Sequence, residues 1–291
     1  MATIKSRQER DEMFITANLP FGLNVTESIG CPERLRSSNI QDLALHQDVH
    51  EFGLAGKIWN SAYILQAFFS PANISEPSSP IPATYYRNSL SPVPTKPYRI
   101  IELGAGTGYV GLSVAQHLRS PCEIIITDLA PVVPLMQANQ DALFPTPDKQ
   151  SPLVLCTDLC WGNSDDAARV LDNKPFDLVI VSDCVYFPEL FSILTHTLKE
   201  VCGPDTQVVI GYKCRSLEKE TGFWQDYFGR YFEYEPVRHL INIPETEEVE
   251  LGGLVGEEEE AFVFVAKKRP ENKIKIADDT FTTLLFCSIG I

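Results

Sequence analysis

The sequence lacks features that would each mark a distinct class of protein. Nowhere does it contain an apolar run near the roughly 20 residues that a membrane helix needs. The first residues, Met1 to Arg10, are too polar for a secretory signal. The eight cysteines include no CxxC pair of the kind that binds zinc or forms a redox couple. We therefore expect no membrane span, no metal site, a cytoplasmic location, and cysteines that act as small apolar residues.

Basic residues are also scarce. Only 24 Lys and Arg stand against 39 Asp and Glu, which gives a formal net charge of -15. Such a charge repels a phosphate backbone, so nucleic acid is not the expected partner and a protein, preferably a basic one, is. Part of the acidity lies in the run Glu257 to Glu260, which we interpret as a solvated loop. The remaining composition, 44% hydrophobic and 22% charged, is typical of a globular α/β domain, which we expect to be monomeric.

Proline divides the chain into parts. Residues 70–97 carry seven prolines among several serines, and this composition breaks both helix and strand. We predict a loop or disordered insertion there, with little apolar surface to bury and no need for it in catalysis. The expected organisation is an N-terminal extension (1–55), one domain (56–268) that contains the insertion, and a C-terminal tail (269–291). Whether the apolar end of the tail packs on the domain, serves a partner or reflects an unusual gene end stays open.

After the insertion, strands and helices alternate. Continuously apolar runs predict buried parallel strands, and helical spacing separates them, as in βαβ units. The expected strands are 99–103, 123–127, 153–156, 176–181 and 207–212, followed by a C-terminal pair at 234–240 and 261–266. The expected helices are 57–69, 109–118, 132–143, 189–201 and 217–232. This pattern predicts a Rossmann-like, mostly parallel α/β sheet that ends in an antiparallel hairpin, with helix 57–69 packed against it.

A glycine-rich loop joins the first of these strands to its helix. Glu102 to Gly108 (ELGAGTG) places Gly104 and Gly106 where a ligand can approach the backbone, next to the free N–H groups of a helix N-terminus. Asp128 follows at the end of the next strand, where a carboxylate can accept both hydroxyl hydrogen bonds of a ribose. A tight turn and a helix cap are the simpler interpretations, and a dinucleotide enzyme shares this geometry.

The spacing of the glycines in the loop favours one class of enzyme. A dinucleotide fingerprint is GxGxxG, whereas this chain has GxGxG. The loop resembles E-L-G-x-G-x-G of the class I, seven-strand methyltransferases. That resemblance implies S-adenosylmethionine as cofactor, held at its amino-acid end by the backbone of Gly104, Ala105 and Gly106 and at its ribose by Asp128.

Three further motifs resemble one branch of that class, the protein-lysine methyltransferases of the methyltransferase-like 21 and fungal elongation-factor type. The segment GKIWNSA contains Trp59, which the resemblance places beside the cofactor. The segment LCWG contains Trp161 but has Cys160 where the branch has aspartate, which leaves the contribution of that acid in doubt. The segment SDCVY supplies Asp183 and Tyr186 of the D-x-x-Y signature. Each motif alone has a simpler interpretation as core packing or backbone bonding.

The resemblance also implies roles. Ser182 and Trp161 would border the adenine, and Trp59 would close the pocket. Asp183 would accept a hydrogen bond from the acceptor amine, and Tyr186 would form a wall of the lysine channel. The expected substrate is a lysine in a protein, a translation elongation factor (1A-like) first of all. The alternatives are transfer to a small nicotinamide-like amine, a non-catalytic cofactor-binding module, and, with least support, a nicotinamide-dependent oxidoreductase.

Overall fold

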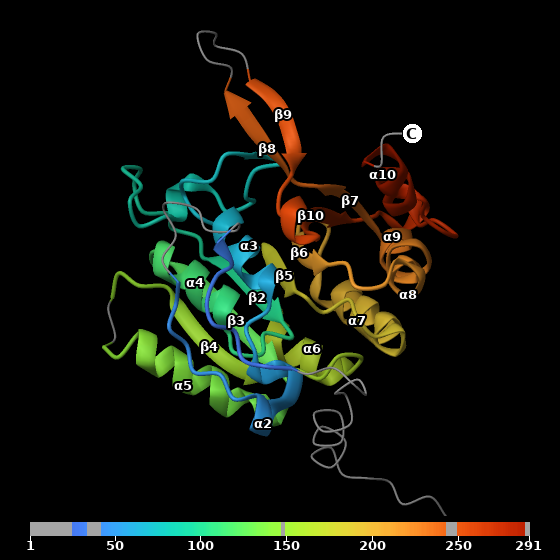
Figure 1. The fold of residues 1–291 in the computed structure, drawn as a ribbon. Helices are drawn as coiled ribbons and strands as arrows, with labels where there is room; N and C mark the ends of the chain where they lie inside the picture. Colours follow the sequence, from blue (N-terminus) through green and yellow to red (C-terminus); the bar gives the residue numbers. More distant parts are fainter. Residues whose placement is uncertain (1–24, 34–41, 147–148, 243–248, 289–291) are drawn as a thin grey trace, which may run out of the picture.

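The computed structural model describes residues 25–33, 42–146, 149–242 and 249–288, and its central feature is a seven-stranded sheet (Figure 1). Its strands are β2 (Tyr98–Leu103), β3 (Cys122–Asp128), β4 (Leu153–Asp158), β5 (Leu178–Ser182), β6 (Gln207–Lys213), β7 (Phe232–Pro236) and β10 (Ala261–Lys268). They run in the order β4-β3-β2-β5-β6-β10-β7. Strands β4 to β6 in this order are parallel, and β10 is antiparallel to both neighbours. The predicted fold class is confirmed.

Helices cover both faces of the sheet (Figure 1). They are α2 (Val49–Phe52), α3 (Asn60–Phe68), α4 (Tyr109–His117), α5 (Val133–Leu143), α6 (Ser164–Leu171), α7 (Pro188–Val201), α8 (Leu217–Gly222), the π-helical η5 (Phe223–Phe228), α9 (Gly229–Tyr231) and α10 (Thr280–Ser288). One apolar core lies between the sheet and α3 and α4, and a second lies between the sheet, α6, α7 and η5. Ile100 of β2 belongs to the first core and Ile101 to the second. Strands buried on both faces explain the continuous apolar runs.

Two elements differ from the prediction. Helix α6 was not expected, although Asn163 caps it by accepting from the N–H groups of Asp165 and Asp166. The strand expected at 234–240 is divided, because the chain leaves the main sheet after β7 and continues as β8 (Arg238–Asn242). Strand β8 pairs with β1 (Ser75–Glu76) and β9 (Val249–Leu254) in a second, three-stranded sheet. The region expected as one acidic loop therefore contains a strand, and the acidic run itself forms an exposed 3-10 turn, η6 (Glu257–Glu259).

The proline-rich insertion is an ordered part of the fold, contrary to its predicted lack of buried apolar surface. Ile81, Tyr85 and Tyr86 all lie in the first core. The Tyr86 hydroxyl donates to the carbonyl of Phe69 at 3.1 Å, and the Arg119 guanidinium donates to carbonyls of the insertion, Thr84 among them. The aromatic residues anchor this segment where prolines prevent regular structure. The premise that the insertion buries little apolar surface is therefore wrong, and its dispensability for catalysis stays a prediction.

The C-terminal tail packs on the domain, which decides the question that the sequence left open for its described part. The Phe281 ring of α10 is stacked on Trp224, with centroids 5.2 Å apart. Just before α10, the buried Asp278 carboxylate accepts from Lys275 at 2.7 Å and from Arg269 at 3.2 Å. Within the described parts of the chain no helix is both long and apolar enough to span a bilayer. The cysteines whose side chains are described all carry free thiols.

Candidate functional site

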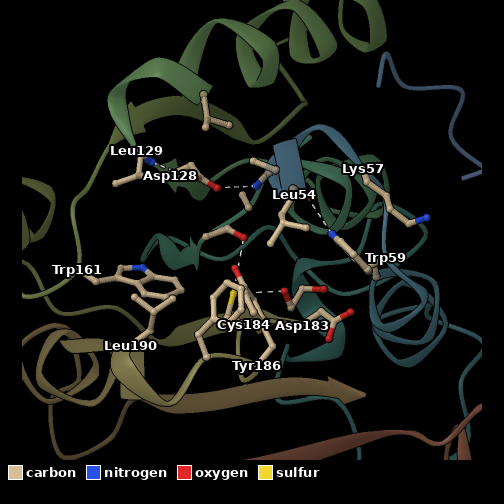
Figure 2. Close-up of a pocket in the computed structure, with 18 of the residues that line it drawn as sticks. Leu54, Lys57, Trp59, Asp128, Leu129, Trp161, Asp183, Cys184, Tyr186 and Leu190 are labelled. Carbon is tan, nitrogen blue, oxygen red and sulfur yellow. Dashed lines mark hydrogen bonds between the residues drawn. The ribbon is translucent and has the colours of Figure 1, made fainter. Parts of the chain in front are cut away.

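A cavity of about 780 Å³ opens at the carboxyl ends of β2, β3, β5 and β6. This is the edge of a parallel sheet at which open α/β folds build their sites. Its lining includes every residue that the sequence analysis singled out: Trp59, Gly104, Ala105, Gly106, Asp128, Trp161, Ser182, Asp183 and Tyr186. In Figure 2, Trp161 and Trp59 stand on opposite sides of the pocket, with Asp128 above and with Asp183 and Tyr186 below. The fold thus brings together side chains that are far apart in sequence, whereas their roles stay predictions.

The glycine loop requires glycine for two separate reasons. Gly104 and Gly106 have φ values of +66° and +55°, a left-handed conformation that side chains disfavour. A Cβ on Gly104 would lie 2.7 Å from Cζ2 of Trp161, and one on Gly106 would lie 2.7 Å from the carbonyl oxygen of Ala55. The loop therefore fits tightly between the Trp161 ring and the segment before α3.

Asp128, at the end of β3, holds this loop in place through a hydrogen bond. Its Oδ2 accepts from the N–H of Gly106 at 2.7 Å, and its Oδ1 accepts from the N–H of Leu129 at 2.7 Å (Figure 2). Burial raises the pKa of the carboxyl group, and these two hydrogen bonds oppose that rise. Each carboxylate oxygen has a second lone pair, so the group can still accept from a ligand diol.

Glu102, the first residue of the motif, is more deeply buried than Asp128. Its side chain lies beneath the loop, and its Oε2 accepts from the N–H of Gly111 at 2.7 Å. Burial raises the pKa of this carboxyl group to about 8, with the Gly111 hydrogen bond opposing the rise. Glu102 also lines the cavity, so the pocket contains a carboxyl group that is protonated at neutral pH.

Trp59 is the N-cap residue of α3, and the helix start aims its indole at the pocket. The indole N–H donates to the carbonyl of Leu54 at 3.0 Å, which fixes the ring (Figure 2). Two cations lie near this ring: Nζ of Lys57 at 5.2 Å and Cζ of Arg215 at 5.3 Å from its centroid. Both distances are within the range of a cation–π interaction.

Asp183 forms an ion pair that was not predicted from the sequence. Its Oδ1 accepts from Nη1 of Arg215 at 2.7 Å and its Oδ2 from Nη2 at 2.6 Å, a bidentate ion pair. Only 1% of the Asp183 side chain is exposed, against 30% for Arg215. The residue has a φ of +57°, which aspartate tolerates better than most residues and which turns the chain sharply after β5. Its carboxylate is therefore already paired in the protein.

Tyr186 and Cys184 follow on the same loop. The Tyr186 ring packs edge-on against Phe187, with centroids 4.6 Å apart, and burial is the main reason that its phenol pKa is raised. The phenol therefore stays protonated at physiological pH, so Tyr186 presents a neutral ring and hydroxyl to the cavity. Cys184 is buried against the glycine loop, where its thiol lies 3.7 Å from the carbonyl oxygen of Gly104.

Arg215, Glu102 and Lys57 also line the pocket, although none of them was predicted to do so from the sequence. A signal for Arg215 was present, because it follows β6 and β6 neighbours β5. Polar residues at the ends of adjacent parallel strands meet at the same edge of a sheet, so Asp183 and Arg215 could have been paired from strand order. In the LCWG motif, Cys160 lines the cavity where the resemblance expects aspartate, and its N–H donates to Asp166 at 3.0 Å.

Chemically, the pocket combines a backbone cradle with carboxyl groups at one end and a cation–aromatic wall at the other. Among the described residues, no group of three or more His, Cys, Asp or Glu side chains could hold a metal ion. The arrangement suits a ligand that hydrogen-bonds to exposed backbone and to carboxylate oxygens at one end and contacts aromatic side chains at the other.

The chain is similar in sequence to several known proteins. A family profile described as lysine methyltransferase matches residues 37–227, more than half of the chain. EEF1A lysine methyltransferase 3 of Xenopus tropicalis is 28% identical over 190 residues, which cover 64% of this chain and 70% of the relative. Protein N-lysine methyltransferase METTL21A of Danio rerio is 30% identical, covering 60% and 67%. Protein-lysine N-methyltransferase EFM6 of Saccharomyces cerevisiae is 27% identical, covering 60% and 69%.

Proposed function

Because the chain belongs to the lysine methyltransferase family, we propose that it transfers a methyl group from S-adenosylmethionine to a lysine side chain of a protein. The observation that supports this best is the convergence of the glycine loop, Asp128, Asp183, Tyr186 and Trp59 on one cavity. A fold alone would not carry the proposal, because the same architecture serves many reactions.

The pocket fits the methyl donor. A volume of about 780 Å³ lies in the range of roughly 300 to 1,000 Å³ that is typical of cofactor sites. The glycines at 104 and 106 leave backbone where a Cβ would collide, so this loop can cradle the amino-acid end. Asp128 would hold the ribose, Trp161 and Ser182 would border the adenine, and Trp59 would close the pocket. When bound, the donor supplies a sulfonium methyl, whose carbon bonds to the lysine nitrogen as the sulfur–carbon bond breaks and leaves its electron pair on sulfur.

The chain's own residues then have to align the amine and keep water out. The Tyr186 ring and the Trp59 indole would flank the lysine stem, because apolar walls accommodate a methylene chain. Asp183 and its ion-pair partner Arg215 would together orient the amine at the end of β5. The lysine has an unperturbed pKa of about 10.4, so it must lose a proton before its lone pair can attack.

We propose a translation elongation factor 1A as the protein substrate, on the basis of the relatives that carry this name. That choice also supports a cytoplasmic location, where translation takes place. The net charge of -15 repels nucleic acid, so the elongation factor and not its RNA should be the contact. We propose a monomeric enzyme, because one chain supplies all the predicted pocket residues, with 56–268 as the catalytic domain.

A transfer assay tests the proposal. Purified elongation factor 1A is incubated with the enzyme and labelled S-adenosylmethionine, and the labelled residue is located by peptide mass spectrometry. We expect label on a lysine, and several-fold less label when the enzyme carries Asp128→Ala at donor concentrations near the wild-type Kd. Label that appears only in small molecules would replace this proposal with transfer to a small amine, and donor binding without any transfer would favour a non-catalytic module.

A further inference from the structure

In the ion pair between Asp183 and Arg215, the positive charge of the guanidinium offsets the negative charge of the buried carboxylate. Both oxygens of Asp183 receive guanidinium hydrogen bonds, at 2.7 and 2.6 Å. Burial lowers the pKa of Arg215, but the hydrogen bonds and charge of Asp183 raise it by more, so the guanidinium stays charged. An incoming ammonium group therefore meets a neutralised carboxylate and not a free anion.

The backbone around Arg215 is held in place, which distinguishes this pair from a chance surface contact. The buried Glu220 carboxylate accepts from the N–H of Arg215 at 3.1 Å and from that of Ser216 at 3.2 Å. The hydroxyl of Tyr212 donates to the same carboxylate at 2.6 Å. Nη1 of Arg215 also donates to the carbonyl of Lys213 at 3.2 Å. The guanidinium is thus anchored at both its backbone and its side chain.

The exposed part of Arg215 faces the cavity beside Trp59. Its Cζ lies 5.3 Å from the centroid of that ring, and Nζ of Lys57 lies 5.2 Å from the same centroid. Burial lowers the pKa of Lys57, whose ammonium therefore lies in a partly desolvated position beside the same ring. A lysine placed next to another cation in a desolvated pocket has a lowered pKa, and this activates it as a nucleophile.

We propose that Arg215 is a positioning residue that, through its ion pair with Asp183, makes the acceptor lysine bind as the uncharged amine. The inference rests on the proposed function and adds how the acceptor is activated. The ammonium releases its proton to solvent as it enters, and the freed lone pair forms the bond to the methyl carbon. No side chain has to serve as general base, which fits a carboxylate that is 1% exposed and already paired.

Other titratable groups face the same cavity. The carboxyl groups are Glu102 under the glycine loop, Asp128 after β3, Glu189 on α7 and Glu220 on α8. The cationic groups are Lys57 before α3 and Lys219 on α8, and the neutral groups are Tyr109, Tyr186, Cys160 and Cys184. None of these residues is substituted in the variants of the ion pair. A difference in pH dependence between those variants therefore reports on the Asp183–Arg215 pair.

The test compares Arg215→Gln, Arg215→Lys and the doubly neutral Asp183→Asn/Arg215→Gln with the wild type. The pH dependence of kcat reports the ionisation of the enzyme–substrate complex, here with elongation factor 1A and saturating donor. In Arg215→Gln the unpaired carboxylate would stabilise the bound ammonium, so the rising limb of kcat should move at least about one pH unit to higher pH. Arg215→Lys and the double variant should keep the wild-type midpoint, with lower turnover. Loss of packing alone would lower kcat in all three without moving any midpoint.

Proton release gives a second readout that needs no turnover. Calorimetric titration of the acceptor into enzyme loaded with S-adenosylhomocysteine, in two buffers of different ionisation enthalpy, counts the protons released on binding. We expect about one proton at pH 7 for the wild type and the double variant, and close to none for Arg215→Gln. If Arg215→Gln does not fold, the proton count of the wild type decides, and a count near zero overturns the inference.

Failure of the inference and failure of the proposed function can be told apart. If the wild type methylates elongation factor 1A but the midpoint of Arg215→Gln does not move, the inference is overturned alone. The same holds if the double variant keeps the alkaline shift. If the wild type transfers no methyl group to the protein, the proposed function fails, and the inference fails with it.

Discussion

The two ends of the pocket are built by different physical means. The end proposed to bind the donor consists of backbone: Asp128 accepts from the N–H of Gly106 in the glycine loop, and Glu102 accepts from the N–H of Gly111 at the start of α4. The end proposed to bind the acceptor consists of side chains, with Asp183, Arg215 and Trp59 held together by charge and aromatic contact. Backbone geometry depends little on single side chains other than glycine, whereas a charge pair depends on both partners. Binding of the donor and activation of the acceptor should therefore respond to different substitutions.

Asp183→Asn should give the largest difference between the effect on methyl transfer and the effect on donor binding. This change keeps the volume of the side chain but removes the anion that fixes Arg215, so turnover should fall about a hundredfold, as when one preorganised electrostatic group is removed. The Kd for S-adenosylmethionine should stay within about threefold, because the glycine loop is untouched. Single-turnover labelling and calorimetry measure the two effects, with the exposed Asp226→Asn as the matched control. Equal losses in binding and transfer would mean that the two ends are not separable.

The converse change is Asp128→Ala at the donor end. It removes the acceptor of the Gly106 N–H and of the expected ribose hydroxyls, at about 1.5 to 3 kcal/mol per charged hydrogen bond, so donor affinity should weaken at least tenfold. The control is Asp158→Ala. Asp158 of β4 lies opposite Asp128 of β3 in the sheet but does not line the cavity. Calorimetric titration that gave the same Kd for Asp128→Ala and wild type would remove Asp128 from the cofactor site.

Glu102 should make the unfolding free energy of the protein depend on pH. Its pKa is raised to about 8 in the folded protein, from 4.5, so the folded state keeps a proton that the unfolded chain loses. The stabilisation that this proton provides is complete below pH 4.5 and is lost as the pH rises towards 8. Relative to Glu102→Gln, which cannot ionise, the unfolding free energy of the wild type should fall by about 2 kcal/mol between pH 6 and 8. Denaturant titrations of both proteins measure this, and a pH-independent difference would contradict the assigned protonation.

The smallest effect is expected for Tyr186→Phe at the acceptor end. The variant keeps the ring that walls the pocket and loses only the hydroxyl, so kcat should change less than about threefold. Tyr186→Ala removes the ring and should lower kcat/KM for the protein substrate at least tenfold, with donor affinity unchanged. A larger loss in Tyr186→Phe than in Tyr186→Ala would give the hydroxyl a chemical role that the geometry does not suggest.

The central sheet could be predicted from local patterns of apolar residues, and part of the pocket lining from motifs that resemble those of a known family. Apolar runs such as 176–181 are long enough to identify a strand, and the glycines of the loop predict a tight turn. The Asp183–Arg215 pair was missed because it depends on β5 and β6 being neighbours in the sheet, and the order of the strands was not predicted. The insertion was misjudged because its prolines dominate the composition, while Tyr85 and Tyr86 bury their rings in the core.

The same limit applied to β8 and α10. Strand β8 continues directly from β7 in sequence and changes sheet at Val237, a buried residue whose N–H donates to the carbonyl of Val263 at 2.8 Å. Nothing in the alternation of residues marks that point. The tail has no motif, and its position depends on the Phe281–Trp224 stacking and the buried Asp278, which are tertiary contacts.

The most direct test of the account is mass spectrometry of elongation factor 1A after incubation with S-adenosylmethionine and either the wild type or Asp183→Asn, with donor binding measured in parallel. The account predicts methylated lysine with the wild type, and with Asp183→Asn nearly full donor binding but almost no methylation. Undiminished lysine methylation by Asp183→Asn, or no methylated protein with a wild type that binds the donor, would contradict it.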